Sequence, residues 1–505
     1  MSQRKAKALM VQGTGSHVGK SVIVAALCRI FYQDGYNVAP FKSQNMALNS
    51  YITIDGGEIG RAQATQAEAA NIEPTVDMNP ILLKPNTDIG AQVIVQGKLH
   101  TNMSVKQYYN YQKDAFKAIK DSYNRLSSQF DLIVIEGAGS PAEINLRKND
   151  IVNMKIAHLA EAPVLLVVDI DKGGAFAWIV GTLALLTQKE RKSVKGIIIN
   201  KFRGDKDLLT SGIEFIEKKT NLPVLGIIPY FKDIYIKEED SVPQEKMNNT
   251  VCNITKIIIA VMYLPHISNF TDFDPLENES DVHLRYIGQG ESIGFADAII
   301  IPGSKNTIDD LNYLKKAGYS EAICRYAQDG GMVLGVCGGY QMLGKKIEDP
   351  YSMESRQKVI AGLGLLNVNT TLAQQKITSQ ITALCSFPSD NVREIKGYEI
   401  HVGETNREDK TKAFCTIIQR SNKSVELEDG ALSEDGQIWG TYIHDLFANH
   451  LFRRDFINLL RKKRGLRNLP HNPQVNLMEN QREYDKLAIH VRENLDMDAI
   501  YKLLN

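Results

Sequence analysis

Short runs of almost wholly apolar residues recur along the first half of the chain, separated by stretches in which apolar residues follow helical spacing. The apolar runs are Ala8–Val11, Asn37–Pro40, Leu132–Ile135, Val164–Val168, Gly196–Ile199 and Val224–Ile227. The helical stretches are Ser21–Gln33, Gly60–Ala70, Val105–Leu126 and Leu208–Thr220. Strands that are apolar on both faces are typical of a parallel sheet covered by helices on both sides. The pattern therefore predicts a doubly wound α/β domain.

The pattern breaks at residues 235–253, which are polar and contain few apolar positions. Strand-like runs then restart at Lys256–Met262, Ala298–Ile301 and Met332–Val336, and helical spacing follows Asn449. We expect a second doubly wound α/β domain followed by a helical C-terminal tail. The predicted parts are a first domain at 1–249, a second domain at 250–449 and a helical extension at 450–505.

Composition is typical of a globular protein and gives no sign of a nucleic-acid, membrane, zinc or disulfide-rich class. Of the 505 residues, 43% are hydrophobic and 23% are charged, which is ordinary for a globular protein, and the formal net charge is zero. A neutral chain gives no electrostatic reason to expect a nucleic-acid or membrane partner. The six cysteines are scattered without C-x-x-C pairs, which argues against a zinc site or disulfide framework and favours a cytoplasmic location.

A glycine-rich loop joins the first predicted strand to the first predicted helix. It reads Gly13-Thr14-Gly15-Ser16-His17-Val18-Gly19-Lys20-Ser21. Backbone N–H groups in such a loop bind phosphates, the lysine reaches the terminal phosphates and the serine hydroxyl can bind Mg²⁺. We therefore predict an ATP site that includes Gly13, Thr14, Gly15, Gly19, Lys20 and Ser21.

Polar side chains at other strand ends are candidate partners of this loop, because open α/β sheets bind ligands there. Glu136 ends a buried strand, and with Ser21 and Asp55 it is a candidate metal ligand. Lys42 is a candidate for phosphate binding, although Lys42 and Asp55 taken alone fit solvated loop charges better than ligands. Asn200 follows another strand and is placed either to contact the adenine edge or to cap a helix.

A second site is indicated by Cys337, which follows the apolar run Met332–Val336 directly and is flanked by glycines. This spacing is typical of a nucleophile elbow, in which a sharp turn exposes a reactive side chain at a helix N-terminus. His444, at the end of another strand-like run, is the candidate base. Backbone N–H groups of Gly303 and Gly338 are candidates for the oxyanion hole.

The cysteine elbow, the Pro302-Gly303-Ser304 turn and the later histidine resemble class I glutamine amidotransferase domains, and the first half resembles dethiobiotin synthetase. In the glycine loop the first glycine lies one residue further back than in the common P-loop, as in that synthetase type. Longer strings resemble the cobyric acid synthase family, namely Val38–Ser50, Asp55–Gln63, Asp77–Pro80, Glu136–Leu146, Asp169–Gly174, Ile267–Leu276 and Gly397–His401. The resemblance extends from residue 8 to about residue 450.

The resemblance implies a P-loop domain and an amidotransferase domain acting together in cobalamin biosynthesis. The implied reaction amidates the b, d, e and g side-chain carboxylates of a corrinoid, adenosylcobyrinic acid a,c-diamide, to give adenosylcobyric acid. It uses ATP, Mg²⁺ and L-glutamine and passes through acyl phosphates. Rival hypotheses are a sibling amidase, acting on cobyrinic acid or a cell-wall lipid precursor, and a partition-type ATPase.

The sequence around His444 departs from ordinary amidotransferases of this class. Their histidine is followed two residues later by a glutamate that orients it, and here that position is Leu446. Asp445 is adjacent to the histidine, and adjacent residues on a strand point to opposite faces. We therefore expect Cys337 and His444 to act as a dyad.

Overall fold

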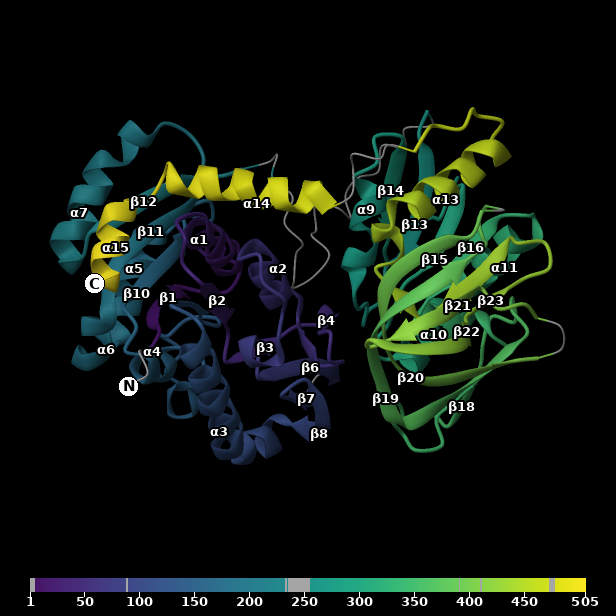
Figure 1. Ribbon diagram of the computed structural model, residues 1–505, viewed down its shortest axis with the longest axis horizontal. Helices are drawn as coiled ribbons and strands as arrows, with labels where there is room; N and C mark the ends of the chain where they lie inside the picture. The colour runs from purple at the N-terminus through teal and green to yellow at the C-terminus, as the bar shows by residue number, and fades with distance from the viewer. Residues whose placement is uncertain are drawn as a thin grey trace.

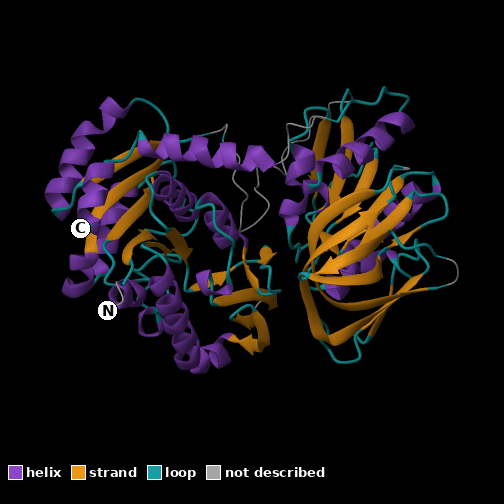
Figure 2. Cartoon of the chain, in the orientation of Figure 1, coloured by secondary structure: helices purple, strands orange, loops and turns teal. Residues whose placement is uncertain are grey.

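A computed structural model describes residues 5–87, 90–231, 234, 255–389, 391–408, 411–471 and 477–505. The predicted domain boundary near residue 250 lies outside the described residues. The chain forms two lobes that lie side by side, each containing sheets and helices (Figures 1 and 2). Both predicted α/β domains are present, so the predicted fold class is confirmed.

The first lobe is built on a parallel sheet in the order β12-β11-β10-β1-β9-β2. Its strands are β1 (Lys7–Gly13), β2 (Val38–Phe41), β9 (Leu132–Glu136), β10 (Val164–Asp169), β11 (Val194–Phe202) and β12 (Val224–Pro229). Each coincides with one of the predicted apolar runs. Met10 packs into the core on one face of the sheet, and Leu9 and Val11 pack into the core on the other. Both faces of the sheet are therefore buried from solvent, which explains the continuous apolar runs.

Helices cover both faces of this sheet (Figure 1). They are α1 (Lys20–Gln33), α2 (Arg61–Ala69), α3 (Val105–Gln129), α4 (Met154–Ala160), α5 (Ala175–Leu185), α6 (Gln188–Ser193) and α7 (Thr210–Thr220), with 3₁₀ turns η1 (Val76–Met78), η2 (Arg147–Asn149) and η3 (Lys206–Leu209). Small sheets that the apolar pattern did not predict lie between α1 and α3 in the chain and face the second lobe. Their strands are β3 (Gln44–Met46), β6 (Ile81–Thr87), β7 (Gly90–Val95) and β8 (Lys98–Ser104), and separately β4 (Ser50–Ile52) and β5 (Glu58–Gly60).

The second lobe contains a sheet in the order β14-β13-β15-β16-β24-β23, parallel except at β23. Its strands are β13 (Ile257–Met262), β14 (Val282–Ile287), β15 (Ala298–Ile301), β16 (Met332–Val336), β23 (Ala431–Leu432) and β24 (Ile438–Thr441). The accompanying helices are η4 (Phe270–Phe273), α9 (Asp274–Glu277), α10 (Thr307–Lys316), α11 (Tyr319–Gln328), α12 (Gly338–Leu343), η5 (Leu446–Ala448) and α13 (His450–Lys463).

A largely antiparallel sheet packs beside this one and was not predicted. Its strands are β17 (Lys346–Glu348), β18 (Val359–Ala361), β19 (Val368–Cys385), β20 (Arg393–Arg407), β21 (Cys415–Arg420), β22 (Lys423–Asp429) and β25 (Ile443–His444). Strand β19 alternates buried and more exposed positions along much of its length. Such alternation gives no continuous apolar run, so a search for buried parallel strands misses it.

The predicted helical extension, residues 450–505, is helical but is not one unit. Helix α13 packs into the core of the second lobe through Phe452 and Phe456. Helices α14 (Leu477–Arg492) and α15 (Met497–Leu504) pack into the core of the first lobe, where Leu487 and Ile500 are fully buried. The chain therefore returns to the first lobe at its end, and both termini lie there (Figure 1).

The lobes meet where the β4–β5 hairpin contacts β19 and β20 of the antiparallel sheet. The hydroxyl of Thr378 donates to the carbonyl of Gly56 at 2.7 Å, and the Gln380 side chain donates to the carbonyl of Ile52 at 2.9 Å. Ile52 is buried against Tyr398 and Ile400. Both hydrogen bonding and apolar burial therefore hold the lobes together.

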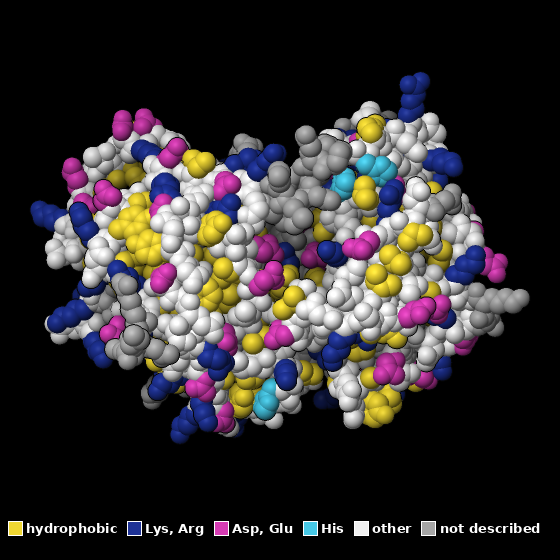
Figure 3. Space-filling model, in the orientation of Figure 1, with side chains coloured by type: hydrophobic (Ala, Val, Ile, Leu, Met, Phe, Trp, Pro, Cys, Tyr) yellow, Lys and Arg dark blue, Asp and Glu magenta, His cyan; other side chains and the backbone are white. Residues whose placement is uncertain are grey.

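Acidic and basic side chains are interspersed over the face of the molecule in Figure 3, in keeping with the zero net charge. Among the described residues, no helix combines the length and apolar character needed to cross a bilayer.

The packing of α14 makes a testable prediction. Replacing the fully buried Leu487 by alanine should destabilise the first lobe by about 2–5 kcal/mol, because a cavity is left in its core. Ile489 lies on the same helix and is 54% exposed, so Ile489→Ala should cost less than about 0.5 kcal/mol. Native-state hydrogen exchange of the α1 amides measures both effects. Equal effects of the two substitutions would contradict this packing.

Candidate functional site

Cys337 lies at the turn between β16 and α12, as the sequence predicts for a nucleophile elbow. Its backbone has φ 51° and ψ −108°, a conformation that non-glycine residues rarely adopt. The turn is tight because β16 and α12 lie close together. A Cβ atom on Gly335 would lie 2.5 Å from the backbone of Gly339, and one on Gly339 would lie 1.9 Å from the carbonyl oxygen of Ile301. Glycine is therefore required at both positions.

The structure brings His444 to the same pocket as Cys337. His444 ends β25, which pairs with Tyr398 and Glu399 of β20. The unpredicted antiparallel sheet thus carries the histidine to the elbow on the parallel sheet. The Nε2 atom of His444 is buried without a well-formed hydrogen bond among the described residues. This nitrogen is available to exchange a proton in the pocket.

Asp272, on η4, is the carboxylate that holds His444. Its Oδ2 lies 2.6 Å from Nδ1 of the histidine, and its Oδ1 accepts a hydrogen bond from the backbone N–H of Asp445 at 3.1 Å. Both Asp272 and His444 are buried. The expected dyad without a carboxylate is therefore wrong: the carboxylate comes from a segment 172 residues earlier in the chain. The string Ile267–Leu276 contains Asp272, but its sequence offers no sign of the pairing.

Burial lowers the pKa of His444, but the negative charge of Asp272, its hydrogen bond and the interaction with Cys337 together raise it to about 10. The imidazole therefore favours its protonated form at neutral pH. A cation beside a thiol stabilises the thiolate, which is the nucleophilic form of cysteine. The arrangement of Cys337, His444 and Asp272 is thus suited to nucleophilic attack on a carbonyl carbon followed by proton donation.

Of the predicted oxyanion-hole residues, Gly338 lines this pocket and Gly303 lies next to His444. A Cβ atom on Gly303 would lie 3.4 Å from Cε1 of His444, and one on Gly338 would lie 3.0 Å from the backbone nitrogen of Ser304. The structure therefore places Gly303 beside the histidine and Gly338 beside Ser304. The role of these N–H groups toward an oxyanion stays a prediction.

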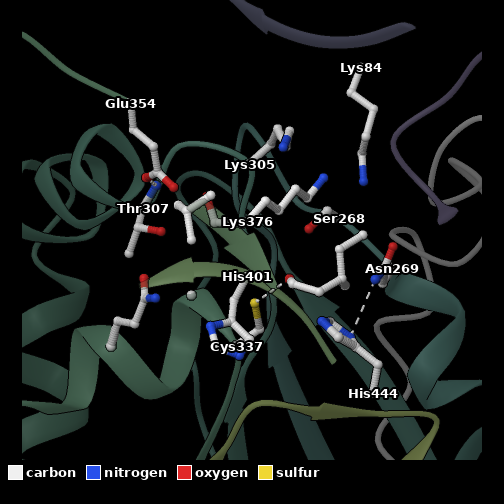
Figure 4. A pocket seen from close by; sticks show the side chains of 15 residues that line it. Lys84, Ser268, Asn269, Lys305, Thr307, Cys337, Glu354, Lys376, His401 and His444 are labelled. Atoms are coloured by element: carbon white, nitrogen blue, oxygen red, sulfur yellow. Dashed lines mark hydrogen bonds between the residues drawn. The ribbon is translucent and has the colours of Figure 1, made fainter. Parts of the chain in front are cut away.

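The pocket is small, with a cavity volume of about 40 Å³. It is lined by Lys84, Ser268, Asn269, Ser304, Lys305, Thr307, Cys337, Gly338, Gln341, Glu354, Lys376, Ile400, His401, Val402 and His444. Figure 4 shows Cys337 and His444 on one side of it, with three lysine side chains on the opposite side. Burial raises the pKa of Glu354 to about 7.

The predicted phosphate loop lies between β1 and α1 as expected. The ammonium group of Lys20 donates to the carbonyls of Gly15 at 2.7 Å and Gly139 at 3.1 Å. Gly19 has φ +96°, and a Cβ atom there would lie 2.1 Å from the side-chain nitrogen of Asn200. That nitrogen donates to the carbonyl of Val18 at 2.8 Å. Asn200 thus supports the loop from within β11, and the helix-cap alternative for it is wrong.

Glu136 joins the loop to its neighbours. Its Oε1 accepts from the Ser21 hydroxyl at 2.8 Å and from Lys42 at 2.7 Å, and its Oε2 accepts from Gln66 at 2.6 Å. Burial raises the pKa of this carboxyl, but Lys42 and the hydrogen bonds lower it below its ordinary value, so Glu136 is ionised. Ser21, Lys42 and Glu136 are thus brought together as predicted.

Asp55 is not brought to this group. It lies exposed in the turn between β4 and β5, where it accepts a hydrogen bond from Thr53, next to the Gly56 carbonyl that contacts the second lobe. Within the described residues, no group of three or more His, Cys, Asp and Glu side chains is arranged to hold a metal ion. Of the three predicted metal ligands, Ser21 and Glu136 lie together and Asp55 does not, and a metal role for the first two stays a prediction.

A second, wider hollow lies beyond Asn200, at the carboxyl ends of β11 and β12. Its lining includes Phe202, Arg203, Tyr230 and His490, and the Arg203 guanidinium lies 3.7 Å from the centre of the Tyr230 ring. His490 comes from α14, so the C-terminal segment forms part of this wall.

These features define a two-lobed protein that combines a P-loop with a cysteine nucleophile. One lobe carries a nucleotide-binding P-loop, and the other carries an elbow cysteine with a histidine and an aspartate. The family described as "CobQ/CobB/MinD/ParA nucleotide binding domain" matches residues 9–243. The family described as "CobB/CobQ-like glutamine amidotransferase domain" matches residues 258–452.

Curated relatives named "Cobyric acid synthase" match almost the whole chain. The protein from Caldanaerobacter subterraneus subsp. tengcongensis is 50% identical over 503 residues, which is 98% of each chain. That from Clostridium kluyveri is 49% identical over 497 residues, again 98% of each chain. The chain belongs to the cobyric acid synthase family, whose members are glutamine-dependent amidoligases of cobalamin biosynthesis.

A solved structure titled "Structure of PurLQS from Thermotoga maritima" aligns with 47% of this chain and 99% of its own, at 16% identity and a TM-score of 0.30. This likeness is too low to inform the fold.

The hydrogen bond from His444 to Asp272 predicts the pH dependence of glutamine hydrolysis. With Asp272 present, the imidazole loses its proton only near pH 10, so kcat/KM should fall as the pH rises through that value. Asp272→Asn removes the charge that raises the pKa, so this alkaline limb should move to lower pH. The maximal rate should fall on the order of 10²-fold, because the base loses its orientation. A pH profile of kcat/KM measures both effects.

Asp274→Asn, two residues further along the same segment, is the matched control and should leave the alkaline limb in place. An Asp272→Asn profile that coincides with that of the control would contradict the role given to Asp272.

Proposed function

We propose that this chain amidates the b, d, e and g side-chain carboxylates of adenosylcobyrinic acid a,c-diamide to give adenosylcobyric acid, using ATP and glutamine. The main support is that one chain holds both groups, Cys337–His444–Asp272 and Lys20–Ser21–Glu136, on two docked lobes. The name shared by relatives that match 98% of the chain supports the choice of a corrinoid substrate.

The second lobe supplies ammonia. The Cys337 thiolate attacks the side-chain amide carbon of glutamine, and backbone N–H groups at Gly303 and Gly338 stabilise the oxyanion. Protonated His444 gives its proton to the leaving nitrogen, so ammonia departs and a glutamyl thioester remains. Water, deprotonated by His444, then releases glutamate and restores the thiolate. Asp272 keeps Nε2 of the histidine directed into the pocket throughout.

The first lobe activates the carboxylate, which accepts ammonia poorly until one of its oxygens becomes a leaving group. Transfer of the terminal phosphate of ATP gives an acyl phosphate, and ammonia displaces phosphate from it. Lys20, whose ammonium group donates to the carbonyls of Gly15 and Gly139, binds the phosphates together with the loop N–H groups. Lys42, which forms an ion pair with Glu136, also binds a phosphate of the nucleotide in this proposal. The hollow beyond Asn200 takes the nucleotide base.

Ser21 and Glu136 fit a Mg²⁺ ion, because both offer oxygen atoms, 2.8 Å apart, and the carboxyl is ionised. A bound Mg²⁺ would neutralise phosphate charge. The two residues would hold it with water molecules completing its shell, since Mg²⁺ keeps several waters.

The rival hypotheses fit less well. A partition-type ATPase has no use for the Cys337 pocket or for the second lobe. A sibling amidase would share both sites, and mass spectrometry of the corrinoid product separates it, because each amidation changes the mass by a fixed amount. The described cysteines are all free, which supports the cytoplasmic location that we propose.

Cys337→Ala tests the division of labour between the lobes. The thiol takes no part in phosphorylation, so the variant should lose glutamine-dependent synthesis yet still amidate with ammonium salt at alkaline pH. His444→Ala should behave similarly but less completely, since a cysteine retains some thiolate without its base. Formation of amidated corrinoid, followed by mass spectrometry, measures each variant.

Lys20→Ala is the complementary variant. It should reduce synthesis from either nitrogen source by on the order of 10²-fold or more, because activation precedes attack by ammonia. Full glutamine-dependent activity in Cys337→Ala, or near-normal synthesis in Lys20→Ala, would refute the corresponding half of the proposal.

Glu136→Gln tests the metal site. The amide keeps the shape of the side chain but removes its charge, so the Mg²⁺ concentration needed for half-maximal synthesis should rise, or turnover should stop. Glu143→Gln, on the loop that follows β9, is a control that should keep the normal requirement. An unchanged Mg²⁺ dependence in Glu136→Gln would show that this carboxylate only braces the loop.

A further inference from the structure

Three lysines that the mechanism above does not use line the pocket of Cys337. Lys84, on β6, and Lys376, on β19, have buried side chains, and Lys305, which follows β15, is half-buried. Figure 4 shows the three side chains gathered opposite Cys337 and His444. Lys84 comes from the first lobe, whereas Lys305 and Lys376 come from the second.

The carboxylates around these lysines do not balance their charge. Glu58, on β5, forms ion pairs with Lys84, at 2.9 Å, and with Lys376. Lys305 donates instead to the neutral side-chain oxygen of Gln92, at 2.8 Å. Among the described residues, no carboxylate lies within ion-pair distance of Lys305. An ammonium group removed from water without a counter-charge is costly, so this wall of the pocket favours an anion.

An acidic side chain, that of Glu354, lies elsewhere on the pocket lining. Glu354 accepts a hydrogen bond from the backbone N–H of Thr307 at 2.7 Å, and Figure 4 shows it beside Thr307, to one side of the lysines. The pKa of Lys305 is lowered well below its ordinary value by burial and by repulsion from Lys376 and Lys84. A bound anion would relieve that repulsion. The pocket therefore places an acidic group apart from the lysines, and the lysine wall suits the carboxylate end of an amino acid.

We propose that Lys84, Lys305 and Lys376 form a subsite for the α-carboxylate of glutamine, built from both lobes and held in place by Glu58. The proposal rests on the proposed use of glutamine at Cys337. Because one of the three ammonium groups belongs to the first lobe, the glutamine site is complete only when the lobes are docked. Glutamine binding in turn stabilises the docked state, since a ligand favours the state that binds it better.

The test uses 4-aminobutanamide, which is glutamine without its α-carboxylate. Hydrolysis of both compounds by the full-length wild-type chain gives a ratio of kcat/KM values, and the subsite predicts that glutamine is favoured roughly 10- to 100-fold. Lys305→Met, Lys376→Met and Lys84→Met should each lower this ratio by raising KM for glutamine, with little change for 4-aminobutanamide. Lys345→Met, at an exposed lysine of the second lobe, is the control.

A wild-type chain that hydrolyses both compounds equally well would overturn the subsite without any variant. Lysine variants that slow both compounds alike would also overturn it, because loss of folding or of general reactivity does not discriminate between them. A ratio that responds to Lys305 and Lys376 but not to Lys84 would refute the part that spans the lobes. Failure of the wild type to hydrolyse glutamine at all would instead refute the proposed function.

Discussion

The docking of the lobes depends on one buried carboxylate, that of Glu58. Its side chain is 1% exposed and is paired with an ammonium group from each lobe, and the two positive charges lower the pKa of its carboxyl despite complete burial. Removing Glu58 would leave two buried ammonium groups without their carboxylate partner, which is far more costly than losing a surface ion pair. The ion pairs therefore fix the position of β5 relative to β19.

That position affects the nucleotide site, because β5 leads directly into α2. Helix α2 carries Gln66, which donates to Glu136, and Glu136 accepts from the Ser21 hydroxyl of the phosphate loop. Arg61, at the start of the same helix, lies 3.7 Å from the carboxylate of Asp445, the residue after His444. Helix α2 thus contacts residues next to both sites. A shift of α2 would therefore move Glu136 in one site and Asp445 beside the other.

The first lobe also supports the histidine more directly. Tyr398 stacks on the His444 ring with a centroid distance of 5.2 Å, and its hydroxyl donates to the carbonyl of Ser50 at 3.3 Å. The backbone N–H of Ser50 donates to Asn269, three residues before Asp272. The base and its carboxylate are therefore both supported by the β4–β5 region, which by chain position belongs to the other half of the protein.

Much of this arrangement could be predicted from the sequence where the signal is local. The buried strands β1 and β16, the phosphate loop and the Cys337 elbow each combine an apolar run with glycines a fixed number of residues away. Asp272 could not be predicted, because it meets His444 only through the tertiary fold. Asp55 was misassigned for the converse reason: a carboxylate in a glycine turn resembles a ligand, but β4 and β5 direct that turn toward Thr378.

The path of the chain between the lobes has a consequence for how the protein can be divided. The second lobe is inserted between β12 and α14 of the first, so the polypeptide crosses between the lobes twice. Two covalent connections restrict how far the lobes can separate, and they keep each at a high effective concentration relative to the other. A gene fragment that stops before α14 would encode a first lobe without part of its own core, so a separately expressed version needs residues from both ends of the sequence.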